Sequence, residues 1–97
     1  HKLGNAIDNK ECDFGIAICG SGNGINMTLN KHKYVRSGLS WNAEVAQLIR
    51  LHNDANVLTI PGRFVTQKEA YDMIKIFFNT EFEGGRHQNR IDKIPCQ

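Results

Sequence analysis

Residues 14–24 read Phe-Gly-Ile-Ala-Ile-Cys-Gly-Ser-Gly-Asn-Gly, an apolar run that ends in three glycines at alternate positions. A run this short, bounded by Asp13 and by the glycines, predicts a parallel strand that is buried on both faces. Residues 25–29 predict a short helix directly after the glycine loop. The order strand, loop and helix is that of a repeating unit of an α/β fold.

Two further strand–helix units follow along the chain. We expect strands at residues 35–39 and 56–60, each followed by a helix, the first of which covers residues 43–52. Because parallel strands separated by helices require right-handed crossovers, the sequence predicts a doubly wound parallel sheet with helices on both faces. The length suits one domain over residues 1–97 and is too short for two.

The two longer helices have recognisable starts and apolar faces. The helix at residues 43–52 is expected to begin at Ser40 or Asn42. The second helix begins at a capping box formed by Thr66 and Glu69. The residues that share the expected apolar faces are Val45, Leu48, Ile49 and His52 in the first helix, and Ala70, Met73, Ile74 and Phe77 in the second.

Composition excludes several classes of function. Hydrophobic residues make up 40% of the chain, and its net charge of +2 is too small to indicate a nucleic-acid-binding surface. No apolar run approaches the roughly 18 residues of a membrane span, and no signal-peptide pattern is present. The three cysteines have no zinc-binding spacing, which indicates a reduced, cytoplasmic protein without a metal centre.

The glycine loop at residues 20–24 lets backbone amides approach a ligand closely and point at an anion. A nucleoside-triphosphate loop would end in Gly-Lys-Ser/Thr, whereas this loop ends in Gly24-Ile25-Asn26. A dinucleotide-binding loop would need glycine at the position of Ile25. Both of these ligand classes are excluded, and a purely structural strand–helix turn remains the alternative to another anion site.

Five side chains near predicted element ends could carry chemistry. Cys19 precedes the loop, where neighbouring amides stabilise a thiolate that acts as base or nucleophile, although a lone cysteine is commonly a small core residue. His52 ends a helix and could transfer protons, or it could be a core histidine. Arg63, Arg86 and Arg90 could clamp a phosphate or could be solvated surface residues.

Several strings of residues, spread over nearly the whole chain, together resemble the ribose-5-phosphate isomerase B family, which includes the galactose-6-phosphate isomerase subunits. The matching strings are Cys19-Gly20-Ser21-Gly22-Asn23-Gly24, Asn30-Lys31, His52-Asn53-Asp54-Ala55-Asn56-Val57-Leu58, Gly62-Arg63 and Phe82-Glu83-Gly84-Gly85-Arg86-His87. The string that begins at His52 and the one that ends at His87 are specific, whereas the glycine loop alone would not be.

The resemblance implies an aldose–ketose isomerase that interconverts ribose 5-phosphate and ribulose 5-phosphate through an enediolate, without a metal or cofactor, in the pentose phosphate pathway. Cys19 matches the base, His52 matches the histidine that opens the furanose ring, and Ser21 completes the catalytic group. Members without this cysteine have glutamate at the position of Ile25. The implied substrate contacts are Gly20, Ser21, Gly22, Asn23, Gly24, Asn53, Arg63, Arg86 and Arg90.

The resemblance also implies a homodimer or higher homo-oligomer whose active sites are shared between subunits. Members of the family carry a strand, a helix and a second strand before the position of His1, and the first strand ends in an Asp-His pair of the active site. We therefore expect that this N-terminal portion is missing. The same chemistry on galactose 6-phosphate or allose 6-phosphate is the nearest alternative. A non-catalytic sugar-phosphate-binding or assembly module is the alternative from another class.

Overall fold

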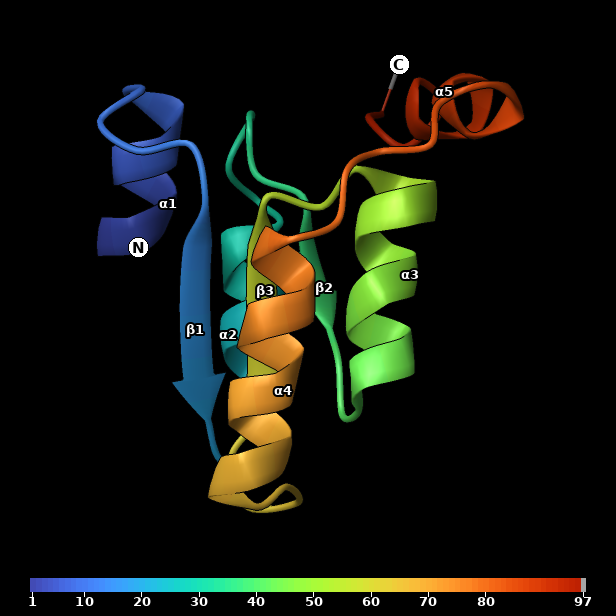
Figure 1. Ribbon diagram of the computed structural model, residues 1–97. Coiled ribbons are helices and arrows are strands. Elements are labelled where there is room, and N and C mark those ends of the chain that lie inside the picture. The colour runs from blue at the N-terminus through green and yellow to red at the C-terminus, as the bar shows by residue number, and fades with distance from the viewer. Residues whose placement is uncertain (97) are drawn as a thin grey trace.

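Three parallel strands form the sheet of the computed structural model, which describes residues 1–96 (Figure 1). They are β1 (Gly15–Cys19), β2 (Ser37–Leu39) and β3 (Val57–Pro61). Their order in the sheet is β1-β3-β2, so β3 pairs with a neighbour on each side. Gly15 and Ser37 both lie opposite Val57, and all three strands therefore start at one end of the sheet. We call this the N-terminal end and the opposite one, after Cys19 and Pro61, the C-terminal end.

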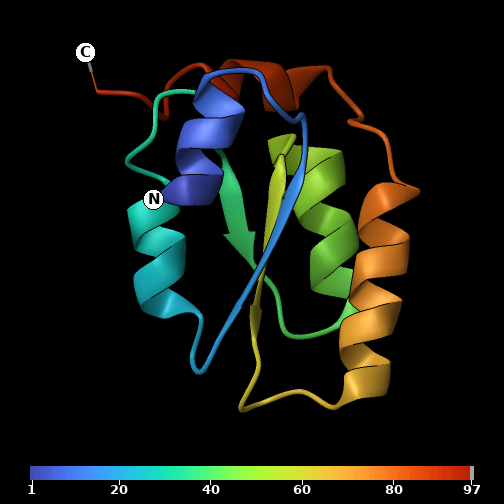
Figure 2. The same ribbon diagram turned by 90° about the vertical axis from the view of Figure 1, so that its left-hand side faces the viewer.

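Helices cover both faces of the sheet, as Figure 2 shows. On one face lie α1 (Lys2–Asp8) and α2 (Asn23–Leu29), and on the other lie α3 (Ala43–Asn53) and α4 (Gln67–Phe78). The short α5 (Arg86–Ile91) lies beyond the N-terminal end of the sheet, next to the end of α3 (Figure 1). This arrangement confirms the predicted doubly wound parallel sheet. Among residues 1–96, no helix is long and apolar enough to cross a lipid bilayer.

Local hydrogen bonds explain where the two long helices begin. The Asn42 side chain accepts a hydrogen bond from the Val45 N–H at 2.8 Å, so Asn42 and not Ser40 is the N-cap of α3. In α4 the Thr66 N–H donates to the Glu69 carboxylate at 2.8 Å, and the Glu69 N–H donates to the Thr66 hydroxyl at 3.1 Å. The predicted capping box is confirmed.

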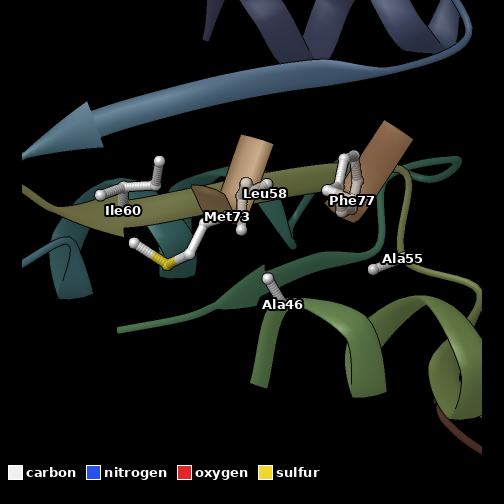
Figure 3. Packing of buried hydrophobic residues seen from close by; sticks show 6 residues of the cluster. All are labelled: Ala46, Ala55, Leu58, Ile60, Met73 and Phe77. Atoms are coloured by element: carbon white, nitrogen blue, oxygen red, sulfur yellow. The ribbon is translucent and has the colours of Figure 1, made fainter. Parts of the chain in front are cut away.

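The main core lies between β3 and the two helices α3 and α4 (Figure 3). Its fully buried members are Ala46, Ala55, Leu58, Ile60, Met73 and Phe77. A second cluster, on the face covered by α1 and α2, contains Ile7, Ala17, Leu29, Val35 and Val57. Because alternate residues of β3 point to opposite faces, this one strand serves both clusters, and every residue of it is buried.

The prediction that the apolar run at residues 14–19 is buried on both faces is only partly right, since Gly15 and Ala17 are buried but the ends of the run are exposed. β1 lies at the side of the sheet, and Ile18 keeps 57% of its surface exposed, with Phe14 at 43%. An apolar run indicates that a strand can be buried. How much of the strand is actually covered depends on the elements that pack against it. The exposed surface includes Cys19, at the end of the strand.

The second strand is shorter than expected, because side-chain hydrogen bonds replace part of its ladder. The Arg36 N–H donates to the Asn56 side-chain oxygen at 2.8 Å, and the Asn56 side-chain N–H₂ donates to the Tyr34 carbonyl at 2.7 Å. Regular pairing starts only at Ser37. One asparagine thus satisfies backbone groups that a longer strand would otherwise pair.

The predicted apolar face of α3 is also only partly right. Leu48 is exposed, and the buried residues of the helix are Ala46 and Arg50. Arg50 can be buried because its guanidinium has several partners: it donates to the carbonyls of Ala55 at 2.6 Å and Thr80 at 3.1 Å. Periodicity counts apolar residues only, so it misses a buried cation that is held by hydrogen bonds.

Candidate active site

The C-terminal end of the sheet carries Cys19, the glycine loop and Arg63. Cys19 ends β1 opposite Pro61, and its carbonyl accepts a hydrogen bond from the Gly62 N–H at 2.8 Å. The Arg63 N–H donates to the Gly20 carbonyl at 3.0 Å. The Arg63 side chain lies against Gly20, since a Cβ placed there would be 3.2 Å from the Arg63 Nε atom. The structure therefore brings together the expected base, the loop and one of the three expected phosphate-binding arginines.

The glycine loop turns sharply at Gly22, which has a φ of +77° and is the N-cap residue of α2. The Ser21 hydroxyl accepts a hydrogen bond from the Asn23 N–H at 3.4 Å, and Ser21, Asn23 and Gly24 are all exposed. The first amides of a helix have no acceptor within that helix, so they remain available to a ligand. An oxyanion that reached this loop would meet N–H donors and a hydroxyl group.

The other expected site residues lie at the N-terminal end of the sheet. β2 leads into α3 at the C-terminal end, and α3 then runs back, so that His52 and Asn53 lie just before β3 begins (Figure 1). The polar segment after Gly85 forms the short helix α5, where Arg86 and Arg90 are exposed one turn apart. The 11 residues of α3 correspond to about 16 Å at the rise of an α-helix. Within one chain, His52 is thus separated from Cys19 by about the length of the sheet.

The His52 ring stacks on the ring of His87. The two ring centroids are 4.3 Å apart, and the ring planes differ by 17°. His87 is 5% exposed, and its Nε2 atom lies 3.9 Å from a carboxylate oxygen of Glu83. Burial, and secondly the nearby charge of His52, lower the pKa of His87 below its ordinary value, with Glu83 acting in the opposite direction. His52 is the more exposed member of this stacked pair.

The segment between α4 and α5 is fixed to α3 by backbone groups. The Glu83 N–H donates to the Leu51 carbonyl at 3.0 Å, one residue before His52. Arg50 reaches the Thr80 carbonyl from the same helix end, and its guanidinium also binds Asp54 at 2.9 Å. These contacts hold α5 close enough for the two histidine rings to stack.

His52, Glu83 and His87 also offer possible metal-ligand atoms, all within 4.8 Å of one another. This group could not be predicted from residue spacing, because its members come from α3, a loop and α5. Two imidazole rings that bind one ion must both contain that ion in their planes, which nearly parallel stacked rings cannot do. In its stacked arrangement the group does not form a metal centre, and we assign none.

A cavity of about 390 Å³ also lies at the N-terminal end of the sheet, between β2, the end of α3 and Ile94. Asn53 is the one expected site residue among those that line it, and neither Cys19 nor His52 does so. Its surface is mostly apolar, which does not suit a sugar phosphate. We therefore do not identify this cavity with the substrate site.

Sequence reasoning missed His87 and Arg50. His87 lies in the string Glu83-Gly84-Gly85-Arg86-His87, and its burial could have been predicted from Ile91, which follows one helical turn later and is also buried. Its stacking on His52 could not, because the two residues are far apart in the sequence and no periodicity relates α3 to α5.

Proteins of known family match the chain over nearly its whole length. The family described as Ribose/Galactose Isomerase matches residues 1–94. A probable ribose-5-phosphate isomerase B of Mycoplasma genitalium is 48% identical over 86 residues, which are 89% of this chain and 57% of that protein. Ribose-5-phosphate isomerase B of Escherichia coli is 39% identical over 89 residues, or 92% of this chain and 60% of that protein.

Solved structures agree with these relatives. The crystal structure of ribose-5-phosphate isomerase B from Mycoplasma genitalium with bound ribulose-5-phosphate has a TM-score of 0.90 at 44% identity, covering 96% of this chain and 62% of that one. The ribose 5-phosphate isomerase of Thermotoga maritima has a TM-score of 0.92 at 40% identity, covering 96% and 64%. The chain thus spans little more than half the length of the first curated relatives, 57% and 53%.

Proposed function

Since the chain belongs to the ribose/galactose isomerase family, we propose that it forms part of an isomerase that interconverts ribose 5-phosphate and ribulose 5-phosphate. A relative that is 44% identical over most of this chain has been solved with ribulose-5-phosphate bound, which favours a pentose phosphate over a hexose phosphate. We further infer that the enzyme works in the cytoplasmic pentose phosphate pathway, in keeping with its three free cysteines.

The observation that carries the mechanism is the separation of the two groups of site residues. Cys19 and the glycine loop lie at the C-terminal end of the sheet, whereas His52 and two arginines lie at the N-terminal end, about 16 Å away along the 11 residues of α3. An extended five-carbon sugar phosphate measures only about 8 Å at ordinary bond lengths. One substrate therefore cannot contact both groups of a single chain.

We infer that the enzyme is a homodimer or a higher homo-oligomer in which the two ends meet across a subunit interface. In a two-fold dimer, an end-to-end contact occurs twice, so each site combines Cys19 of one subunit with His52 of the other. Arg86 and Arg90 would then bind the phosphate from the same side as His52, and Arg63 from the side of the loop.

The proposed reaction has two stages. In the first, His52 donates a proton to the ring oxygen of the furanose as its bond to C1 breaks, and the C1 hydroxyl gives its proton to solvent water, which leaves an open-chain aldehyde. In the second, the Cys19 thiolate removes the proton on C2, and amides of the glycine loop stabilise the enediolate oxygen. Return of a proton to C1, with transfer of the O2 proton to O1, produces the ketose.

The shared site can be tested with hybrid dimers of the full chain. Cys19→Ala and His52→Asn each remove one half of every site, so each variant alone should lose most of its turnover. Coexpression with two affinity tags isolates the hybrid. It should recover about half of the wild-type activity, since one of its two sites holds both intact residues. The double variant Cys19→Ala/His52→Asn paired with wild type is the matched control. Each of its two shared sites has one defective residue, so this hybrid should be nearly inactive, whereas a site within one chain would leave it half of the wild-type activity.

The outcomes discriminate between the assignments. Normal turnover of ribose 5-phosphate by the Cys19→Ala variant would show that Cys19 is not the base. A hybrid without recovery would show that the two residues do not share a site across subunits. If the wild-type chain turns over galactose 6-phosphate but no pentose phosphate, the proposed pentose phosphate substrate is wrong.

A further inference from the structure

His87 takes no part in the roles described so far, although it is the most buried polar side chain near the proposed acid. It is 5% exposed, lies on the inner side of α5, and stacks on His52 with 4.3 Å between ring centroids. We propose that His87 is a positioning residue, whose buried ring holds the His52 imidazole in the orientation needed to protonate the substrate ring oxygen. This inference rests on the proposed function, because it assumes that His52 opens the sugar ring.

The first support is mechanical. The His87 ring is fixed by its burial and by the turn of Gly84 and Gly85, both of which have positive φ angles. His52 is the last but one residue of α3 and is half-buried, so its own helix restrains it little. A flat ring stacked at 17° removes rotation of the imidazole out of its plane while its edge nitrogens remain free to donate.

The second support is the charge around the pair. The charged groups that act on His87 are His52 from α3, Glu83 from the preceding loop, and Arg86 and Arg90 from α5. Three of these four are cationic when His52 is protonated, and burial also disfavours a charge on His87. Burial and the neighbouring cations thus favour the neutral form of His87, whose ring can stack on His52 without repulsion between two charged rings.

The test uses two reactions that differ in their need for ring opening. Ribose 5-phosphate is mainly a closed furanose, so its conversion requires His52. Ribulose 5-phosphate cannot close a five-membered ring, because its C5 oxygen carries the phosphate. Exchange of its C1 hydrogen with solvent deuterium therefore reports proton abstraction by Cys19 without ring opening.

His87→Leu removes the flat ring and keeps the site apolar, and His87→Phe keeps a flat ring of similar size. We expect His87→Leu to slow conversion of ribose 5-phosphate by about threefold to tenfold, the range of an aromatic pair, and to leave the exchange rate unchanged. His87→Phe should retain conversion within about twofold of wild type. Gln88→Leu, on the exposed side of α5, is the matched control and should change neither rate.

Each result decides the matter. Conversion that is unaffected in His87→Leu would overturn the positioning role. Equal losses of conversion and exchange would also overturn it, because they would mean a general structural role. If the wild-type chain performs exchange but His52→Asn converts ribose 5-phosphate normally, the role of His52 fails and this inference fails with it. A thermal unfolding curve is measured for every variant. It shows whether His87→Leu and His87→Phe are both folded at the assay temperature, so that their rates can be compared with those of the wild type.

Discussion

Replacement of Gly22 by alanine should be among the most destabilising single-methyl additions in the chain. Gly22 has a φ of +77°, a left-handed conformation that costs an L-residue about 1–2 kcal/mol. A Cβ atom there would lie 2.6 Å from Leu39 Cδ1, 3.2 Å from Thr59 Cγ2 and 3.5 Å from the Pro61 Cα atom. Leu39 would have to move, and such overpacking typically costs a further 1–3 kcal/mol or so. We expect a total loss of about 2–5 kcal/mol in the free energy of unfolding.

Gly24 provides a matched control two residues later in the same loop. A Cβ atom there would meet no atom within 4 Å, and Gly24 is already in the first turn of α2. Gly24→Ala should therefore be neutral or stabilise by up to about 1 kcal/mol. Urea unfolding of the wild type and both variants at one protein concentration measures the difference, since oligomerisation shifts apparent stability. A Gly22→Ala midpoint equal to that of the wild type, or equal losses in both variants, would refute the reasoning.

Three further predictions follow from buried or charged groups. Arg50→Leu should lower the free energy of unfolding by about 1–3 kcal/mol, because it leaves the buried carbonyl of Ala55 and the partly buried carbonyl of Thr80 without this donor, and Arg50→Lys should recover only part of this in urea titrations. Burial is the chief cause that lowers the pKa of His87 in the folded chain. The unfolded chain therefore binds a proton on His87 more tightly than the folded chain does. The unfolding midpoint should fall as the pH drops below about 6.5, less so in His87→Phe. A hydrogen bond from the Tyr34 N–H lowers the pKa of Asp8, which adds a later loss as the pH falls below about 3.8. Arg86→Ala should raise KM and change kcat little in a coupled isomerase assay, because Arg86 is expected to bind the unreactive phosphate. A normal KM would show that Arg86 does not bind the phosphate.

Sequence motifs predicted those structural features correctly that depend only on residues close together in the chain. Thr66 and Glu69 bond to each other across three residues, so their capping box needs nothing from the rest of the fold. The exposure of Ile18 is different, because it depends on what lies beside β1 in space. The position of β3 in the middle of the sheet is another such case, since the chain order of the strands does not determine it.

The separation of Cys19 from His52 was available in principle from the predicted fold. In a strand–helix–strand unit the helix runs antiparallel to the strands, so a residue at the end of a helix lies at the opposite end of the sheet from a residue at the end of a strand. Cys19 ends a strand, and His52 lies one residue before the end of a helix. Treating both as neighbours in one pocket of one chain would contradict this geometry. Any fold of this kind that uses both residues on one small substrate must bring two chains together, which is why recovery of activity in the hybrid dimer is a test of the fold as much as of the chemistry.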